Sequence, residues 1–423
     1  MAEEQRYWDA EIETMPLAKL RKIQEERLQL LVARAYEKTT LYRRKFEEAG
    51  IKPADIKTLD DLKKLPLIEY LEDFCNTPVA DKLAVPLDEV KEISSTSGTV
   101  SGFTQPCLKT QHEGELSYDA LARMRWTIGA RPWDIVQLLG GPPEGYKRLG
   151  AAVMMFWAGR GNLDYQIRLA KVMNVTILEQ LPSLALRYLE RAKEIGINIR
   201  ETKLRLVTGA GEPLATTIRK KVEFEHGVSL RMMYGSSETG FIAGECEHQE
   251  GMHILSDHYI VEVIDPQTKE LLNPGEEGEI VVTPLLGETM PLIRYRIGDV
   301  GSLLPYKPCP CGRTHPKISL VKGRVAHIIR LQSKKILPID IEEVLASISE
   351  LGNEYQIIVP RQGESERLKV KVEVKPTAEE LERLKHQTEE ALYQRLGIDT
   401  EVELVSLGDI GRTLFKAQRL ILS

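Results

Sequence analysis

The sequence predicts a large α/β domain followed by a small α+β domain. A chain of 423 residues is longer than one hydrophobic core usually organises, so two or three domains are expected. Between Ile135 and Gly287, short apolar runs alternate with helical stretches, which is typical of an α/β domain. Near Gly323 the order changes to strand, helix, strand, strand, helix, strand, which indicates a small α+β domain. We therefore place the domains at residues 1–322 and 323–423.

Hydrophobic periodicity assigns the elements in order along the chain. Charged and apolar residues recur at helical spacing from Pro16 to about Gly50, so helices are expected there. In the α/β domain, DIVQLL, VTILEQL, LRLVTGAG and GEIVVTPL predict strands, and PSLALRYLERAKEIG predicts a helix. In the C-terminal stretch, HIIRL, YQIIVP, LKVKVEV and EVELVSL predict strands, whereas IEEVLASI and AEELERLKHQTEEALYQRL predict helices.

Composition excludes several classes of protein. Hydrophobic residues make up 42% and charged residues 28%, which is the balance of a globular domain. The net charge of -6 gives no positive field for nucleic acid or for an anionic membrane. There is no run of eighteen apolar residues and no signal-peptide pattern at the N-terminus. Five cysteines are an odd number, which favours a reducing compartment, so we expect a cytoplasmic protein.

A hydroxyl-rich loop follows the expected strand VKEI. It reads SSTSGTVSGFTQ, from Ser94 to Gln105, and offers Ser97, Gly98 and Thr99 as donors to phosphate oxygens. It is not a Walker loop, because the GK[ST] ending is missing. A surface loop of the same composition is the alternative interpretation.

Three turns after expected strands carry further polar groups. The first ends in Gly211 and Glu212, and the second, MMYGSSETG, contains Tyr234 and Glu238. A tyrosine face can stack on a purine, and a glutamate beside phosphate can hold magnesium. The third, IRYRIGDVG, contains Asp299, whose carboxylate can accept from both ribose hydroxyls. Each turn taken alone also fits a purely structural role.

Three cysteines and a histidine fall into a metal-binding pattern. Cys246 and His253 form a Cys-x6-His pair, and Cys309 and Cys311 form a Cys-x-Cys pair in a proline-glycine turn. Three thiolates and one imidazole saturate zinc and leave no open position, so the predicted zinc site is structural. His248 is a competing ligand, and reduced surface cysteines without metal are the alternative.

The order of these motifs resembles the adenylate-forming superfamily. The loop, GAGEP, YGSSETG, YRIGDVG, KGR and a lysine near the C-terminus follow one another as in that superfamily. The stretches LPSLALRYLERAKEIGI, CEHQEGMHILSDHYIVEVID and CPCGRTHPKI are similar to the phenylacetate-CoA ligase family, and the resemblance covers nearly the whole chain. It implies a reaction with ATP and Mg²⁺ that forms an acyl-AMP and then a thioester with coenzyme A, and a C-terminal domain that rotates between the two steps.

The resemblance also implies roles for single residues. Lys416 would act on the substrate carboxylate and the α-phosphate, Glu238 would hold magnesium, and Arg324 would lie at the hinge on the nucleotide side; these three form the expected catalytic set. The expected nucleotide-binding set shares positions in the glycine turns and the hinge: Ser97, Gly98, Thr99, Gly211, Glu212, Tyr234, Gly235, Ser236, Ser237, Asp299 and Arg324. Some relatives carry the four zinc ligands and others lack them.

Two departures from the family pattern leave the acceptor open. Gly102, Phe103 and Thr104 stand where relatives carry lysine, proline and threonine, and Val325 and Ala326 replace acidic residues after KGR. The second loop would line the CoA channel, so an adenylyltransferase that leaves AMP on its product is an alternative to the CoA ligase. A nucleotide-binding pseudoenzyme is a third hypothesis, against which the retained motifs argue.

The identity of the acid is also open. Aromatic residues of the middle segment are candidates for the pocket of an aryl or arylacetic acid: Trp126, Phe156, Trp157 and Tyr165. Core packing explains the same residues, and a short branched or hydroxylated aliphatic acid is the alternative substrate. Relatives are often dimers, so a homodimer is a further expectation.

Overall fold

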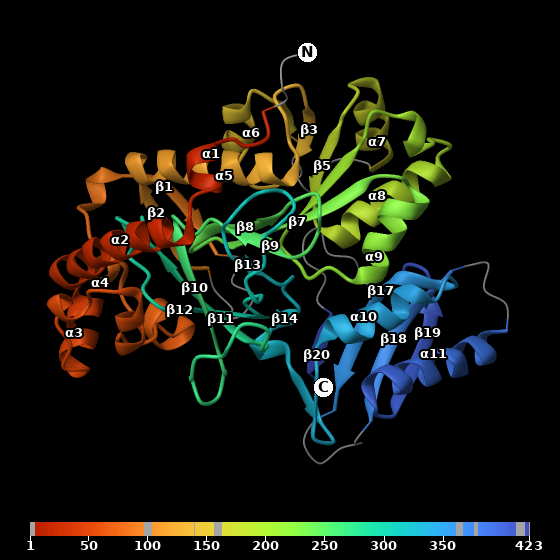
Figure 1. Cartoon of the computed structure of the whole chain (residues 1–423). Coiled ribbons are helices and arrows are strands. Elements are labelled where there is room, and N and C mark those ends of the chain that lie inside the picture. The colour runs from red at the N-terminus through yellow and green to blue at the C-terminus, as the bar shows by residue number, and fades with distance from the viewer. Residues whose placement is uncertain are drawn as a thin grey trace. The chain divides into compact units, whose positions relative to one another are not determined.

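The described residues of the chain form two compact units. The computed structural model (Figure 1) describes residues 5–96, 104–138, 140–155, 163–360, 367–375, 380–411 and 419–422. Unit 1 comprises residues 1–134, 142–153 and 231–320, and unit 2 comprises residues 135–141, 154–230 and 321–423, with the gaps just given. Each unit is described below by itself.

Helices of unit 1 begin and end at residues that favour helix termini. Helix α2 (Leu17–Lys38) buries Leu20, Leu28 and Leu31 on one face. The next residue is Thr39, whose hydroxyl accepts from the Tyr42 amide and so caps α3 (Thr40–Glu48). Helix α5 (Gln111–Ile128) is capped in the same way by Thr110, and it ends at a glycine in the left-handed region.

The strands of unit 1 form three antiparallel groups: β1–β2, β10–β11–β12 and β13–β9–β8–β7. The bounds of the remaining unit 1 elements are α1 (Ala10–Glu13), η1 (Pro53–Asp55), η2 (Leu59–Lys64), η3 (Tyr70–Cys75), α4 (Val79–Lys82), η4 (Leu87–Glu89), β1 (Val90–Ser95), β2 (Pro106–Thr110), α6 (Glu144–Leu149), β8 (Gly240–Glu245), β9 (Met252–Ile254), β10 (Tyr259–Ile264), β11 (Gly278–Pro284), β12 (Tyr295–Gly301) and β13 (Lys317–Ile318). Strands β4 (Ala152–Met155) and β7 (Ser229–Ser236) cross the boundary between the units.

The first part of unit 2 is an α/β layer. Its strands β3 (Ile135–Leu138), β5 (Ile177–Gln180) and β6 (Leu206–Gly209) are parallel neighbours. Parallel strands need crossover connections, which here contain helices. These connecting and following helices are α7 (Leu163–Val172), α8 (Pro182–Glu194), η5 (Ile199–Glu201), α9 (Thr216–Lys220) and η6 (Lys221–Glu225).

The C-terminal part of unit 2 is a four-stranded sheet with two helices. The strand order is β19–β18–β17–β20, and β18 alternates buried and half-buried residues from Leu368 to Val372 as LKVKVEV predicts, whereas Glu373 is buried as well. Helices α10 and α11 pack against each other and against β17 and β19 (Figure 1). The bounds are β14 (Gly323–Arg324), η7 (Val325–His327), β15 (Ile329–Leu331), β16 (Lys334–Ile336), α10 (Pro338–Ser347), β17 (Leu351–Val359), β18 (Leu368–Val374), α11 (Leu381–Leu396), β19 (Thr400–Ser406) and β20 (Leu420–Leu422).

The predicted fold class is confirmed: helices open the chain, an α/β region follows, and an α+β region closes it. Some very short strands, such as β16 and β20, were not predicted. The predicted boundary between residues 322 and 323 stays a prediction. Among the described residues, no helix is long and apolar enough to cross a membrane.

Candidate active site and metal cluster

The predicted nucleotide-binding residues belong to both units. Unit 1 carries the YGSSETG turn between β7 and β8, and Asp299 on β12. Unit 2 carries Gly211, Glu212 and Arg324. The remaining predicted site residues lie outside the described residues: Ser97, Gly98, Thr99, Phe156, Trp157 and Lys416.

Tyr234 and Asp299 are joined within unit 1. The Tyr234 hydroxyl donates to Asp299 Oδ2 over 3.1 Å, and both residues are buried. Tyr234 stands near the end of β7, and Asp299 lies on β12. The hydrogen bond therefore ties the predicted adenine-stacking ring to the predicted ribose acceptor.

Glu238 has a buried partner that the sequence did not suggest. The hydroxyl of Tyr295, at the start of β12, donates to Glu238 Oε1 over 3.1 Å. Tyr295 is fully buried, and burial together with the Glu238 charge raises the pKa of its phenol well above the ordinary value. The phenol thus stays protonated and keeps donating. Glu238 itself is half-buried, so one carboxylate edge remains for a cation.

The turn that carries Ser236 and Ser237 needs glycine at its base. A β-carbon on Gly235 would lie 2.3 Å from the carbonyl oxygen of Gly240, closer than any real contact. Ser236 Oγ lies 3.0 Å from Thr239 Oγ1, while Ser237 is exposed. The close approach of β7 and β8 holds Ser236 inward and leaves Ser237 accessible to a ligand.

Glu212 performs a structural task in unit 2 that was not expected. Its Oε1 accepts from the Ser183 amide over 2.6 Å, at the N-terminus of α8. Leu181, which precedes α8, has no side-chain cap to offer, so the glutamate satisfies an otherwise unpaired amide. Gly211 has φ 87°, which favours glycine, and Arg324 is half-buried on β14.

Two other aromatic candidates for an acid pocket are placed by the structure. Trp126 is buried on α5, packs on Trp8 with ring centroids 5.7 Å apart, and donates from Nε1 to the Arg6 carbonyl. Tyr165 is 63% exposed on α7. Both are explained without a substrate, Trp126 by packing against the N-terminal segment and Tyr165 by its exposure.

The four predicted zinc ligands are brought together. The ligand atoms of Cys246, His253, Cys309 and Cys311 all lie within 4.8 Å of one another, and all four residues are buried. The sulfurs of Cys246 and Cys309 are 3.7 Å apart, and Cys311 Sγ lies 3.4 Å from His253 Nε2. His248 is not in this group; its Nε2 lies 3.7 Å from a Glu247 oxygen.

Strand pairing explains how the cluster forms. In the β8–β9 hairpin, Gly244 pairs with His253, and Cys246 directly follows β8. Residue Lys317 of β13 pairs with His253 from the other side, which brings in the Cys309–Cys311 turn. The three segments therefore converge at one edge of the sheet.

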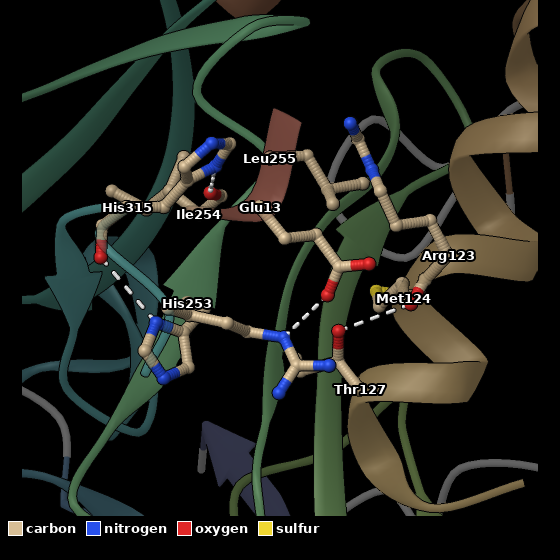
Figure 2. Close-up of a pocket in the computed structure, with 10 residues that line it drawn as sticks. Glu13, Arg123, Met124, Thr127, His253, Ile254, Leu255 and His315 are labelled. Atoms are coloured by element: carbon tan, nitrogen blue, oxygen red, sulfur yellow. Dashed lines mark hydrogen bonds and ion pairs between the residues drawn. The ribbon is translucent and has the colours of Figure 1, made fainter. Parts of the chain in front are cut away.

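The His253 ring is oriented for coordination. Its Nδ1 lies 3.3 Å from the carbonyl oxygen of His315, as Figure 2 shows. A carbonyl can only accept, so Nδ1 carries the proton. The unprotonated Nε2, which faces Cys311, is then available to coordinate a metal. Hydrogen bonding to Cys246 lowers the pKa of Cys311, while hydrogen bonding to Cys311 and burial raise the pKa of Cys246.

An N-terminal strap, which we define as residues 6–15, covers the cysteine turn. Tyr7 donates to the Cys311 carbonyl over 3.1 Å, and Arg6 donates to the Pro310 carbonyl over 2.7 Å. Glu13 forms a buried ion pair with Arg313 over 2.6 Å; Glu13 lies beside His253 and His315 in the small cavity of Figure 2. The strap meets the turn across some three hundred residues of sequence, so local sequence patterns carry no signal of it.

Comparisons with known proteins identify the family. Residues 148–284 match the model of AMP-binding enzymes, and residues 333–422 match the model of the AMP-binding enzyme C-terminal domain. The phenylacetate-coenzyme A ligase of Thermus thermophilus is 34% identical, over 87% of this chain and 84% of the relative. The Escherichia coli protein of the same name is 31% identical, over 97% of this chain and 96% of the relative.

Solved structures agree with this relationship. A 2-hydroxyisobutyryl-CoA ligase in the postadenylation state, in complex with 2-HIB-AMP, has a TM-score of 0.91 and 26% identity, covering 100% of this chain and 94% of that chain. The same ligase with 2-HIB-AMP and CoA in the thioesterification state has a TM-score of 0.71 and 28% identity, covering 100% and 93%. The resemblance predicted from the motifs is confirmed, and the chain belongs to the phenylacetate-CoA ligase family of adenylate-forming enzymes.

Proposed function

We propose that this protein is an ATP-dependent acid:CoA ligase that acts on an arylacetic acid. In the first step a carboxylate oxygen attacks the α-phosphorus of ATP, the bond to the β-phosphate oxygen breaks, and pyrophosphate leaves. In the second step the CoA sulfur attacks the acyl carbon, AMP leaves with its phosphate oxygen, and the thiol proton goes to solvent. Family membership at 34% identity is the observation that carries this proposal.

The residues of unit 1 have the chemistry that the nucleotide requires. The Tyr234 ring would stack on adenine while its hydroxyl fixes Asp299, whose carboxylate would accept the ribose hydroxyls. Glu238, held by Tyr295, offers the hard oxygen ligand that magnesium prefers, and bound magnesium supplies positive charge at the phosphates. Ser236 and Ser237 offer hydroxyl donors beside them.

Residues of unit 2 and of the C-terminal tail complete the proposed site. Gly211 and Glu212 would border the base, and Arg324 would approach the ribose or phosphates. Lys416 would place its ammonium where charge develops on the carboxylate and the α-phosphate, and Ser97, Gly98 and Thr99 would bind phosphate oxygens. We assign these residues to a domain of residues 1–322 and to a small mobile domain of residues 323–423.

Arylacetic acids are the first choice of substrate because the sequence relatives of 30–34% identity are named phenylacetate-CoA ligases. In the same proposal, Phe156 and Trp157 would line the pocket for the ring of the acid. A short hydroxylated aliphatic acid is the second candidate, favoured by the TM-score of 0.91 to a 2-hydroxyisobutyryl-CoA ligase.

One assay tests the function and ranks the acids. Purified protein is incubated with ATP and magnesium, with phenylacetate, 2-hydroxyisobutyrate or no acid, and with or without CoA. Mass spectrometry then follows AMP, pyrophosphate and acyl-CoA. Acyl-CoA formation with phenylacetate is the expected result. Pyrophosphate release without thioester would instead support adenylyl transfer, and no product with any acid would contradict the ligase.

We further propose that Cys246, His253, Cys309 and Cys311 bind a structural zinc ion. Three buried thiols and a ring nitrogen within 4.8 Å fit tetrahedral zinc, with no position open for substrate. Metal analysis of the purified protein should give one zinc per chain. Cys309→Ser should lose it, whereas the matched change His248→Ala should keep it, and equal loss in both would contradict the ligand set.

Two expectations complete the proposal. We propose a homodimer, which sedimentation velocity would detect as a species of twice the mass of 47.8 kDa. We propose a cytoplasmic location, which fits reduced cysteines and would be tested by fractionating cells that express the protein at its native level.

A further inference from the structure

Helix α9 lacks a cap of its own and receives one from a distant part of the chain. Ala215 precedes α9 and has no side chain that accepts a hydrogen bond. The amides of Thr216 and Thr217 donate instead to the two carboxylate oxygens of Glu343, over 2.5 and 3.2 Å. The Thr217 hydroxyl adds a third bond of 3.0 Å. A carboxylate at a helix N-terminus both satisfies free amides and meets the positive end of the helix dipole.

Glu343 comes from α10, 127 residues after Thr216, so this contact ties the C-terminal part of unit 2 to its α/β part. Burial opposes the charge of Glu343, but the bonds from Thr216 and Thr217 lower its pKa below the ordinary value. A second bond joins the same two parts, from Asn353 Nδ2 to Glu190 Oε2 over 2.7 Å. The carboxylate therefore stays ionised at neutral pH, the form in which it accepts these bonds.

The same arrangement brings the C-terminal strand toward a predicted nucleotide residue. Arg419, directly before β20, donates to Glu354 over 2.8 Å and interacts electrostatically with Glu212. Arg419 follows Lys416 by three residues in the sequence. Glu212 is the residue proposed to border adenine. The contact at Glu343 and the interaction of Arg419 with Glu212 thus both join the C-terminal part of unit 2 to its α/β part.

We propose that Glu343 is a positioning residue whose carboxylate latches α10 to α9 and holds the C-terminal part of the chain in the arrangement that serves adenylation. The proposal rests on the proposed function. The 2-hydroxyisobutyryl-CoA ligase has been solved in a postadenylation state, an open conformation and a thioesterification state, so that relative adopts more than one state. Release of the latch accompanies the step that uses CoA.

Glu343→Gln keeps the shape of the side chain and removes its charge. Two half-reactions are measured: acid-dependent exchange of pyrophosphate into ATP, and single-turnover transfer of a supplied acyl-AMP to CoA. Loss of charge-assisted bonds should slow the exchange about tenfold and leave the CoA step unchanged or faster. Thr217→Val, which removes only the hydroxyl donor, should give a smaller change in the same direction. Glu390→Gln, on the exposed face of α11, is the matched control and should change neither half-reaction.

Hydrogen exchange of the peptide over residues 214–225 gives a readout that does not depend on activity. Exchange should be faster in Glu343→Gln than in the parent and in Glu390→Gln. Unchanged exchange, or equal slowing of both half-reactions, overturns the latch. If the parent catalyses neither half-reaction, the proposed function fails, but hydrogen exchange still tests the contact between Glu343 and α9. Faster exchange in Glu343→Gln than in the parent would support the contact, and unchanged exchange would contradict it.

Discussion

The cysteine–histidine cluster and the residues proposed to bind the nucleotide differ in how the fold brings them together. The four cluster residues belong to one unit, and the pairing of β8, β9 and β13 sets their spacing. The residues proposed to bind the nucleotide come from both units and from segments outside the described residues. The proposed zinc site is thus completed within one unit, whereas the proposed catalytic site depends on several separate parts of the chain.

The largest effect should come from replacing the C-terminal lysine, because this change tests the proposed catalytic site without altering the cysteine–histidine cluster. Lys416→Ala should reduce acid-dependent ATP–pyrophosphate exchange by about 10²–10³, because a charge that stabilises the transition state is lost. Zinc content and thermal stability should not change, since Lys416 is not among the four proposed zinc ligands. Lys22→Ala, with a side chain 78% exposed on α2, serves as the control. An equal loss of exchange activity in Lys22→Ala would contradict the catalytic role proposed for Lys416.

The second largest effect should come from removing one ligand of the cysteine–histidine cluster. Cys309→Ser should lower the free energy of unfolding by roughly 3–5 kcal/mol, because loss of a metal site is among the most destabilising changes. Urea denaturation measures this value. The strap should also become sensitive to protease, since it is held by the carbonyls of Pro310 and Cys311. Stability equal to that of His248→Ala would show that the cluster contributes nothing to the fold.

A smaller effect should distinguish a buried tyrosine that bonds to Glu238 from a buried tyrosine that does not. Tyr295→Phe removes the donor to Glu238 and should raise the magnesium concentration needed for half-maximal activity by about fivefold, as one hydrogen bond is lost. Tyr188→Phe removes a comparable buried bond, to Gln137 over 3.0 Å in unit 2. It should leave the magnesium requirement unchanged. A shift in both variants would indicate a general effect of stability on activity.

The smallest effect should be the pH dependence of the contact between Glu343 and α9. Burial and the carboxylates of Glu212, Glu343 and Glu354 raise the pKa of Glu342 to about 8, although Arg419 opposes the shift. A released Glu342 ionises near its ordinary value of 4.5. The latched arrangement therefore binds a proton more tightly, and it weakens as pH rises from about 4.5 to about 8.

Hydrogen exchange of residues 214–225 at pH 6 and pH 8, corrected for intrinsic rates, measures this dependence. Protection should be lower at pH 8 than at pH 6 in the parent protein. It should change little in Glu342→Gln, which cannot ionise. A pH dependence that persists in Glu342→Gln would assign the effect to another group.

Local patterns predicted the fold well because each element carries its own signal. LKVKVEV alternates as a strand must, and Pro182 starts a helix of the expected length. The spacing of Cys246, His253 and the Cys309–Cys311 pair also indicated that they would meet. It could not choose between His253 and His248; the pairing of His253 with β13 makes that choice in the fold.

Local sequence patterns could not predict contacts between residues that are distant in sequence. Tyr295 is 57 residues from Glu238, and Glu343 is 127 residues from Thr216. Nothing in either local sequence distinguishes these residues from an ordinary core tyrosine or a solvated helical glutamate. Only the folded arrangement decides which donors and acceptors meet.

The strap has a practical consequence for the handling of the protein. Tyr7 and Arg6 close over the peptide groups that flank Cys311, and a side chain on Gly312 would collide with the Tyr7 hydroxyl. Air oxidation of thiols depends on access to the sulfur. A preparation that begins after residue 15 should have its cysteines oxidised, and the proposed zinc ion removed by chelators, sooner than one that keeps the strap. An affinity tag is therefore better attached away from this end.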